Sequence, residues 1–239
     1  MLSDLWVATP SLPARIVDRP GCASLMQRLR LVGAVQKEPV CFVSHAGTPL
    51  GSVQDILDRA AEDAAALPLA TPPAGSPPHL ATLRLQKQTG MRLNIVAFPS
   101  AAAAVQAAEA GNVAVAALGL TEAAEGLRAG RLAGLGVAAR TRHDAFPDLE
   151  ALVESGLRFS ATIWRGIAVP AGSDDARVAG LRAALREVAD DSGFRDLGLE
   201  SGFAATWLDG EAWVARAEAE RAEFAALWRE TPWRPAGVG

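Results

Sequence analysis

The sequence contains little of what metal-binding, redox or membrane-spanning proteins require. Its 239 residues include only two cysteines and three histidines, and these residues do not occur at metal-ligand spacing. No stretch reaches the roughly 18 consecutive apolar residues of a membrane-spanning helix, because charged residues, Gly or Pro interrupt every hydrophobic run. We therefore expect no metal centre, no cofactor and no membrane span.

Concentrated positive charge is also missing. The formal net charge is −4, and the 23 Lys and Arg residues are scattered singly along the chain. A chain without a basic patch has no field that attracts a phosphate backbone, so nucleic acid is not an expected partner. Cys22 and Cys41 either form one disulfide or remain free thiols, and the second alternative is favoured because free cysteine is commonly buried.

The first ten residues, MLSDLWVATP, lack the basic and apolar regions of a signal peptide. Any export signal was therefore cleaved, left out or never present. If the chain starts at Met1, a cytoplasmic location follows.

Catalytic signatures are absent as well. The sequence has no GxSxG, HExxH, phosphate-loop or GxGxxG motif. Ser44 and His45 are adjacent, but neighbouring residues on a strand point to opposite faces, so they cannot act together as nucleophile and base. We expect a protein that is not an enzyme.

Half of the residues are hydrophobic, which is enough for a large buried core. Short apolar runs alternate with Ala-rich helical stretches, a rhythm typical of an α/β protein with a mainly parallel sheet. Ser52 and Asp55 have the spacing of a capping box, and a final amphipathic helix is predicted over 211–228. The predicted strands are Leu5 to Thr9, Val40 to Ser44, Leu67 to Thr71, Leu93 to Phe98, Val113 to Leu118, Leu132 to Ala138 and Ile163 to Val169.

Four motifs follow one another in a distinctive order. They are LNIVAF at 93–98, AGRL at 129–132, FPDLEALVESG at 146–156 and IWRGIAVPAGSDD at 163–175. In this order the sequence resembles the receptors of tripartite tricarboxylate transporters, the family that includes the tricarboxylate-binding and Bug-type receptors. The resemblance covers nearly the whole chain, from about Leu5 to Trp228.

The resemblance implies an α/β, two-lobed, periplasmic-binding-protein-like fold of type II with two crossover strands. One lobe would comprise residues 46–160, and the other would combine 1–45 with 161–239. The family's opening strand, helix and glycine-rich loop have no counterpart here, so the first lobe is expected to be incomplete.

The resemblance also implies ligand-binding loops. The first matches the family at Thr71, Gly75, Ser76 and His79, although prolines in it remove N–H donors. An alternative for this loop is a rigid helix start, with Ser76 as cap and Pro77 in the first turn.

Two further segments match the family's ligand loops. Phe98, Ser100 and Ala101 form the second loop, and Thr121 belongs to a third, in which Glu122 is expected to face solvent. A carboxylate held there would rely on backbone N–H groups at helix starts.

Trp164 and Arg165 lie on the second predicted crossover strand. The guanidinium of Arg165 has the geometry to pair a ligand carboxylate, and an ion pair with an acidic residue of the chain is the alternative. Trp164 is expected to pack the hinge rather than stack on a ligand.

The function implied by the resemblance is a periplasmic solute-binding receptor. It would capture a small organic anion, a di- or tricarboxylate, between its lobes and deliver it to membrane permease subunits. Two alternatives stay open: a degenerate receptor-fold interaction module, and a cytoplasmic effector-sensing domain. A homodimer is also expected, because an incomplete first lobe exposes a sheet edge.

Overall fold

A computed structural model describes residues 6–8, 11–18, 22 and 24–233. The chain forms two compact units. Unit 1 contains residues 1–37, 163–198 and 204–239, and unit 2 contains residues 38–162 and 199–203. The lobe boundaries expected from the sequence stay a prediction. Leu5 and Thr9, the ends of the first predicted strand, lie outside the described residues.

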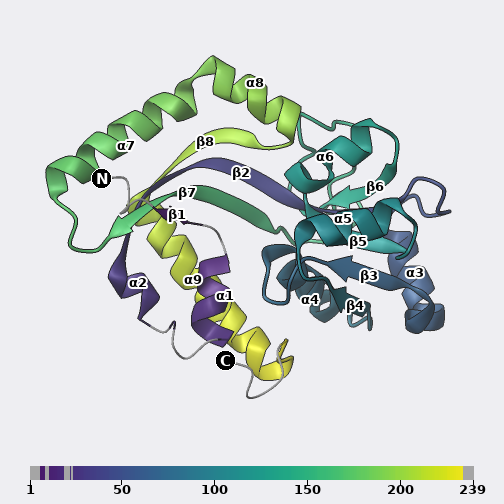
Figure 1. Ribbon diagram of the computed structural model, residues 1–239. Coiled ribbons are helices and arrows are strands. Elements are labelled where there is room, and N and C mark those ends of the chain that lie inside the picture. The colour runs from purple at the N-terminus through teal and green to yellow at the C-terminus, as the bar shows by residue number, and fades with distance from the viewer. Residues whose placement is uncertain (1–5, 9–10, 19–21, 23, 234–239) are drawn as a thin grey trace. The chain divides into compact units, whose positions relative to one another are not determined.

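The sheet of unit 2 combines two strand directions (Figure 1). β3 pairs in parallel with both β4 and β5, whereas β2 pairs antiparallel with β5 and β6. The prediction of a mainly parallel sheet is therefore correct for β3 to β5 and wrong for β2. The alternation of strands and helices in the sequence predicts parallel pairing only for strands that belong to βα repeats. β2 begins in unit 1, outside these repeats, so the alternation does not predict its direction. The strands are β2 (Leu29–His45), β3 (Pro68–Thr71), β4 (Asn94–Ala97), β5 (Val115–Gly119) and β6 (Leu132–Val137).

Four α-helices connect these strands: α3 (Val53–Asp63), α4 (Pro77–Thr89), α5 (Ala101–Glu109) and α6 (Leu120–Arg128), with a 3-10 turn at Ala64–Ala66 after α3. The predicted capping box of α3 is confirmed. The Ser52 hydroxyl accepts the Asp55 N–H at 3.2 Å, and the Asp55 carboxylate accepts the Ser52 N–H at 3.0 Å.

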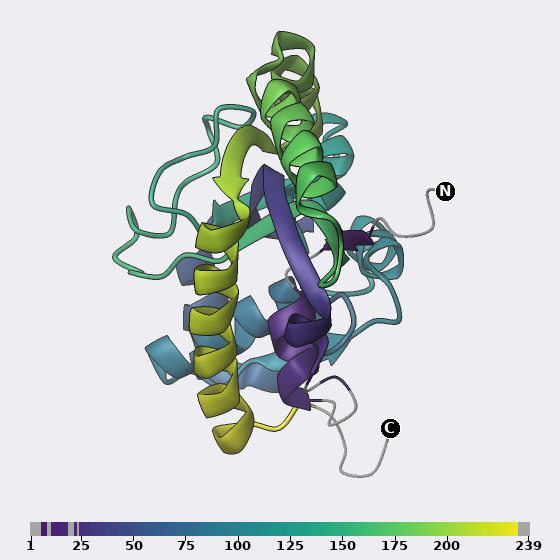
Figure 2. The same ribbon diagram turned by 90° about the vertical axis from the view of Figure 1, so that its left-hand side faces the viewer.

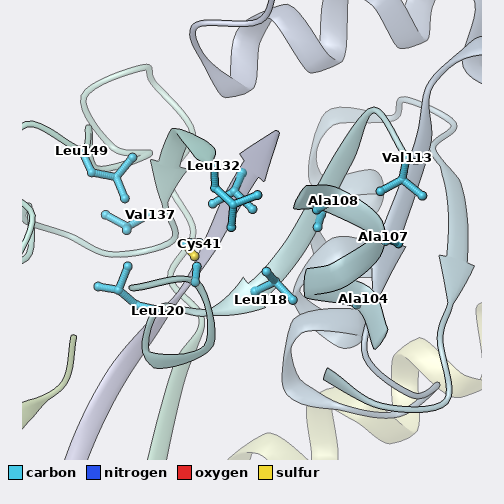
Figure 3. Close-up of a cluster of buried hydrophobic side chains, with 14 of the residues drawn as sticks. Cys41, Ala104, Ala107, Ala108, Val113, Leu118, Leu120, Leu132, Val137 and Leu149 are labelled. Atoms are coloured by element: carbon cyan, nitrogen blue, oxygen red, sulfur yellow. The ribbon is translucent and has the colours of Figure 1, made fainter. Parts of the chain in front are cut away.

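A core cluster of unit 2 lies between the sheet and helices α5 and α6 (Figure 3). Ala104 and Ala108 bring α5 onto the sheet through small buried side chains, while Leu118 and Val137 fill the space around Cys41. The Cys41 thiol is free and fully buried, and this burial raises its pKa. Cys22 is also free, so the structure has two thiols rather than a disulfide.

Unit 1 contains β1 (Trp6–Ala8), the first part of β2, β7 (Thr162–Pro170) and β8 (Ala204–Asp209). Its helices are α1 (Ser11–Asp18), α2 (Leu25–Arg28), α7 (Asp175–Asp190), α8 (Ser192–Ser201) and α9 (Gly210–Glu230), of which α8 ends in unit 2. β1 runs antiparallel to β7, and β8 runs antiparallel to β2. β8 and the part of β2 before Val40 were not predicted from the sequence.

The predicted last helix is confirmed as α9, which runs beside α1 (Figure 2). Four residues of its predicted apolar stripe, Trp213, Ala217, Phe224 and Leu227, are buried. Trp228 is only half-buried and meets the ring of Trp233 edge-on, with the ring centroids 4.6 Å apart. The stripe is therefore core.

β7 and β2 meet in unit 1 at two glycines. A Cβ atom added to Gly166 would lie 2.1 Å from the carbonyl oxygen of Gly33 and 2.4 Å from the Cα atom of Ala34. Both neighbours are backbone atoms of a strand and cannot rotate away. Gly166, the glycine of the IWRGIAV segment, is therefore required by close backbone packing.

We expect Gly166→Ala to destabilise unit 1 by about 3 kcal/mol or more, because overpacking against backbone forces strand β7 away from β2. Gly180→Ala is the matched control, since nothing lies within 4 Å of a Cβ at that helical position. Urea unfolding of both variants measures the difference. Equal free energies of unfolding for the two variants would show that β7 can move away from β2 without a loss of stability.

Candidate functional site

Three helices of unit 2 begin at one edge of its sheet (Figure 1). β3, β4 and β5 are parallel, so their carboxyl ends share an edge, and α4, α5 and α6 follow them. The predicted ligand loops around Thr71, Ser100 and Thr121 are therefore brought to the same edge. The amide of Phe98 also donates to the carbonyl of Thr71 at 2.8 Å, which ties the first two loops together. Ligands of α/β proteins commonly bind at such an edge.

The first loop uses its hydroxyl groups internally. Thr71 is fully buried, and its hydroxyl donates to the carbonyl of Pro72 at 2.9 Å. Ser76 is the N-cap of α4, where its hydroxyl accepts the His79 N–H at 3.4 Å, and Pro77 occupies the first turn. The rigid helix start that the sequence left open is therefore formed.

His79 is held as a neutral imidazole behind this loop. Its side chain is 6 % exposed, and Nδ1 accepts the N–H of Gly75 at 3.5 Å. Burial lowers the pKa of His79 to about 4, because a charged ring would lose its hydration. With Nδ1 acting as acceptor, the proton of the neutral ring lies on Nε2. Gly75 has a φ of +81°, a conformation that favours glycine.

The second loop presents the start of α5 to solvent. Ser100 is exposed, and its hydroxyl caps the helix by accepting the Ala103 N–H at 3.1 Å. Within the described part of the chain, no acceptor meets the amides of Ala101 and Ala102. Phe98, predicted to approach a ligand, is half-buried and packs against the core of unit 2. The available donors are therefore backbone amides.

The start of α6 is occupied by two carboxylates of the chain itself. Glu122 folds back to accept the Gly119 N–H at 2.9 Å and is half-buried, so the expectation that it faces solvent is wrong. Glu38 of β2 accepts the Thr121 N–H at 2.8 Å and is fully buried. Sequence reasoning missed Glu38, because a charged residue before an apolar run gives no sign that it is buried.

In unit 1, β7 directs Trp164 and Arg165 to opposite faces of the sheet, as strand alternation requires. Trp164 packs with Ala168 and Trp213, whereas Ile167 and Val169 on the other face pack with Val178. The prediction that Trp164 is a packing residue agrees with this position. Its contribution to a ligand site stays a prediction, as does that of Arg165, which already interacts with other groups of the chain.

Two cations flank the Trp164 ring. Lys37 Nζ and Arg216 Cζ each lie 5.8 Å from the ring centroid. The indole Nε1 is buried and has no hydrogen-bond partner in the part of the chain that the structure describes. Cation–π contact therefore accounts for the surroundings of the ring, but the indole N–H is unsatisfied.

The described residues contain no group of three His, Cys, Asp or Glu side chains placed to hold a metal ion. Among the same residues, no helix is long and apolar enough to span a bilayer. The donors at the sheet edge are amides and hydroxyls, and such donors bind anions rather than metal ions.

We expect His79 to make stability depend on pH. Its folded pKa of about 4 lies below the ordinary pKa of histidine, 6.5, so the unfolded state binds more protons between these two pH values. Stability should fall by up to about 3 kcal/mol as the pH drops from 6.5 to 4, and level off below that. Unfolding free energies of wild type and His79→Gln across this window measure the slope.

NMR titration of the ring protons gives an independent reading. A His79 signal that titrates near pH 6.5 would contradict the prediction.

Comparison with known proteins places these observations in a family. Residues 23–221 match the family described as tripartite tricarboxylate transporter family receptor. A curated relative, a UPF0065 protein of Bordetella pertussis, is 24% identical over 159 residues. That alignment covers 66% of this chain and 49% of the relative, so the chain spans about half the length of the curated protein it matches.

Solved structures share the fold. A TctC solute-binding protein from Polaromonas is 22% identical with a TM-score of 0.77, over 95% of this chain and 78% of that one. The MatC protein of Rhodopseudomonas palustris, solved with bound malate, is 21% identical with a TM-score of 0.81, over 93% and 78%. An R. palustris protein solved with adipate is 20% identical with a TM-score of 0.84, over 94% and 76%.

These likenesses confirm the predicted two-lobed α/β fold of periplasmic binding proteins. The family match extends over most of the chain, from residue 23 to residue 221. The chain therefore belongs to the tripartite tricarboxylate transporter receptor family.

Proposed function

We propose that this chain binds a small organic carboxylate at the sheet edge of unit 2, with the start of α5 as the principal anion-binding element. The observation that carries the proposal is the exposed Ser100 cap, followed by the amides of Ala101 and Ala102, which meet no acceptor among the described residues. Amide groups at a helix N-terminus point outward and carry a favourable dipole for an anion.

The remaining predicted residues have supporting roles in this proposal. Thr71, Gly75, Ser76 and His79 shape the neighbouring loop, since their polar groups are engaged with one another or with the backbone. A buried neutral His79 adds no charge beside the ligand. The carboxylate is thus recognised by hydrogen bonds from the backbone rather than by an ion pair.

Carboxylates are supported as the ligand class by the family and by its structural relatives. Two proteins of the same fold were solved with malate and with adipate, both dicarboxylates. Membership of the receptor family further supports a periplasmic protein that delivers its ligand to membrane permease subunits.

Self-association is a further part of the proposal. β4 lies at the end of the strand order and pairs with β3. Its Val96 is 38 % exposed. An apolar edge strand of this kind can pair with a second copy, which supports a homodimer.

One feature favours the alternative of a receptor-fold module without transport activity. Pro77 and Pro78 carry no N–H at the start of α4, and this helix therefore offers fewer donors to an anion. The two functions differ in whether α5 binds a carboxylate at all.

Removing one amide at the start of α5 tests the proposal. Ala101→Pro deletes an N–H at the first helical position, where proline is tolerated and the preceding Ser100 is already extended. We expect the affinity for the best-bound carboxylate to fall by roughly tenfold, the effect of losing one hydrogen bond to a charged group.

Isothermal titration of malate, succinate, adipate and citrate measures the affinities. Gln106→Ala, an exposed change on the same helix, is the control and should leave them unchanged. Absence of heat with all four ligands would favour the module without transport activity, and equal affinity of Ala101→Pro and wild type would place the carboxylate elsewhere.

A further inference from the structure

Glu38 places an internal carboxylate at the start of helix α6. It is fully buried at the first position of unit 2, yet its carboxylate reaches helix α6 and accepts the Thr121 N–H at 2.8 Å. Thr121 is eighty-three residues away in the sequence, so this is a tertiary contact and not a local cap. The bond is of the same kind as one between a helix N-terminus and a bound anion.

The backbone around Glu38 is fitted to this carboxylate. A Cβ atom added to Gly119 would lie 3.2 Å from both carboxylate oxygens of Glu38. Such contacts are tighter than ordinary van der Waals packing, so a side chain at this position would push the carboxylate from its place. Gly119 therefore leaves the room in which the Glu38 carboxylate lies against the start of α6.

Two carboxylates already oppose the partial positive charge of this helix start. The N-terminus of a helix carries about half a positive charge, and both Glu38 and Glu122 direct carboxylates to the first turn of α6. A ligand carboxylate at this position would meet a Thr121 N–H that already donates to Glu38. It would also lie beside two carboxylates of the same charge, which would repel it. The start of α6 is thus closed to an anionic ligand.

The three helix starts of the edge therefore differ in what they offer. α4 begins with two prolines, α6 carries two internal carboxylates, and α5 retains the amides of Ala101 and Ala102. The starts of α5 and α6 lie at the same edge of the sheet, after the parallel strands β4 and β5.

From this arrangement we infer that Glu38 is a specificity-determining residue: it substitutes for a ligand carboxylate at Thr121 and restricts unit 2 to a single anionic group of the ligand. The inference rests on the proposed carboxylate-binding function. It assigns to this receptor ligands with one carboxylate, or with carboxylates far apart, and discriminates against ligands with clustered carboxylates such as citrate.

The test replaces Glu38 and follows individual amides. Glu38→Ala frees the Thr121 N–H and removes the negative charge. In ¹H–¹⁵N NMR spectra, added citrate should shift the Thr121 amide of this variant but not that of wild type. The affinity for citrate relative to butyrate, measured by isothermal titration, should rise roughly tenfold over wild type.

Glu122→Gln is the matched control. It neutralises the other carboxylate of the same helix start but leaves Glu38 on Thr121, so the Thr121 amide should stay insensitive to citrate. If Glu38→Ala fails to fold, Glu38→Gln keeps the volume of the side chain and removes its charge. The affinity for citrate relative to butyrate should then rise by about threefold, because this variant relieves only the charge repulsion between residue 38 and citrate.

Two different signals separate this inference from the proposed function. If the amides of Ala101 and Ala102 do not respond to butyrate in wild type, α5 is not the carboxylate site. If the Thr121 amide of Glu38→Ala does not respond to citrate, Glu38 does not determine specificity and has a structural role only. The same conclusion follows if the affinity for citrate relative to butyrate is unchanged in both Glu38 variants. A Thr121 amide that already responds in wild type would overturn it as well.

Discussion

The N–H groups of a helix's first turn need acceptors from outside the helix, and this constraint governs unit 2. Parallel pairing of β3 with β4 and β5 places the starts of α4, α5 and α6 at one edge. Each start must be satisfied by a side chain, by solvent or by a ligand. The chemistry of the edge therefore depends on which amides the chain has already satisfied.

The chain satisfies most of them itself. Ser76 and Ser100 cap their own helices, and Glu122 and Glu38 accept the amides at the start of α6. A carboxylate from another part of the chain forms as good a bond as one from a ligand, but it is always present. Among the described residues, the amides of Ala101 and Ala102 at the start of α5 meet no acceptor, which is why the proposed anion site lies there.

Local features of this molecule were predictable from the sequence, and long-range ones were not. The Ser52 capping box and the Ser76 helix start depend on residues three apart; the first was predicted, and the second was one of the two alternatives given for its loop. β8 is half-exposed without clear alternation, and the early part of β2 carries Gly33 and Lys37, so neither shows the pattern of a strand. Glu38 depends on a helix eighty-three residues away, and no local signal could have identified it.

The motifs that define the family and the proposed anion-binding groups lie in different parts of the chain. Gly166 of the IWRGIAV segment is required by the backbone of Gly33, so this motif is maintained by packing. Trp164, on one face of β7, packs with Ala168 and Trp213, so the motif also contributes a side chain to the packing of unit 1. Sequence motifs therefore identify the receptor fold, whereas the proposed selection of the ligand depends on the helix starts of unit 2, where Glu38 already accepts the Thr121 N–H.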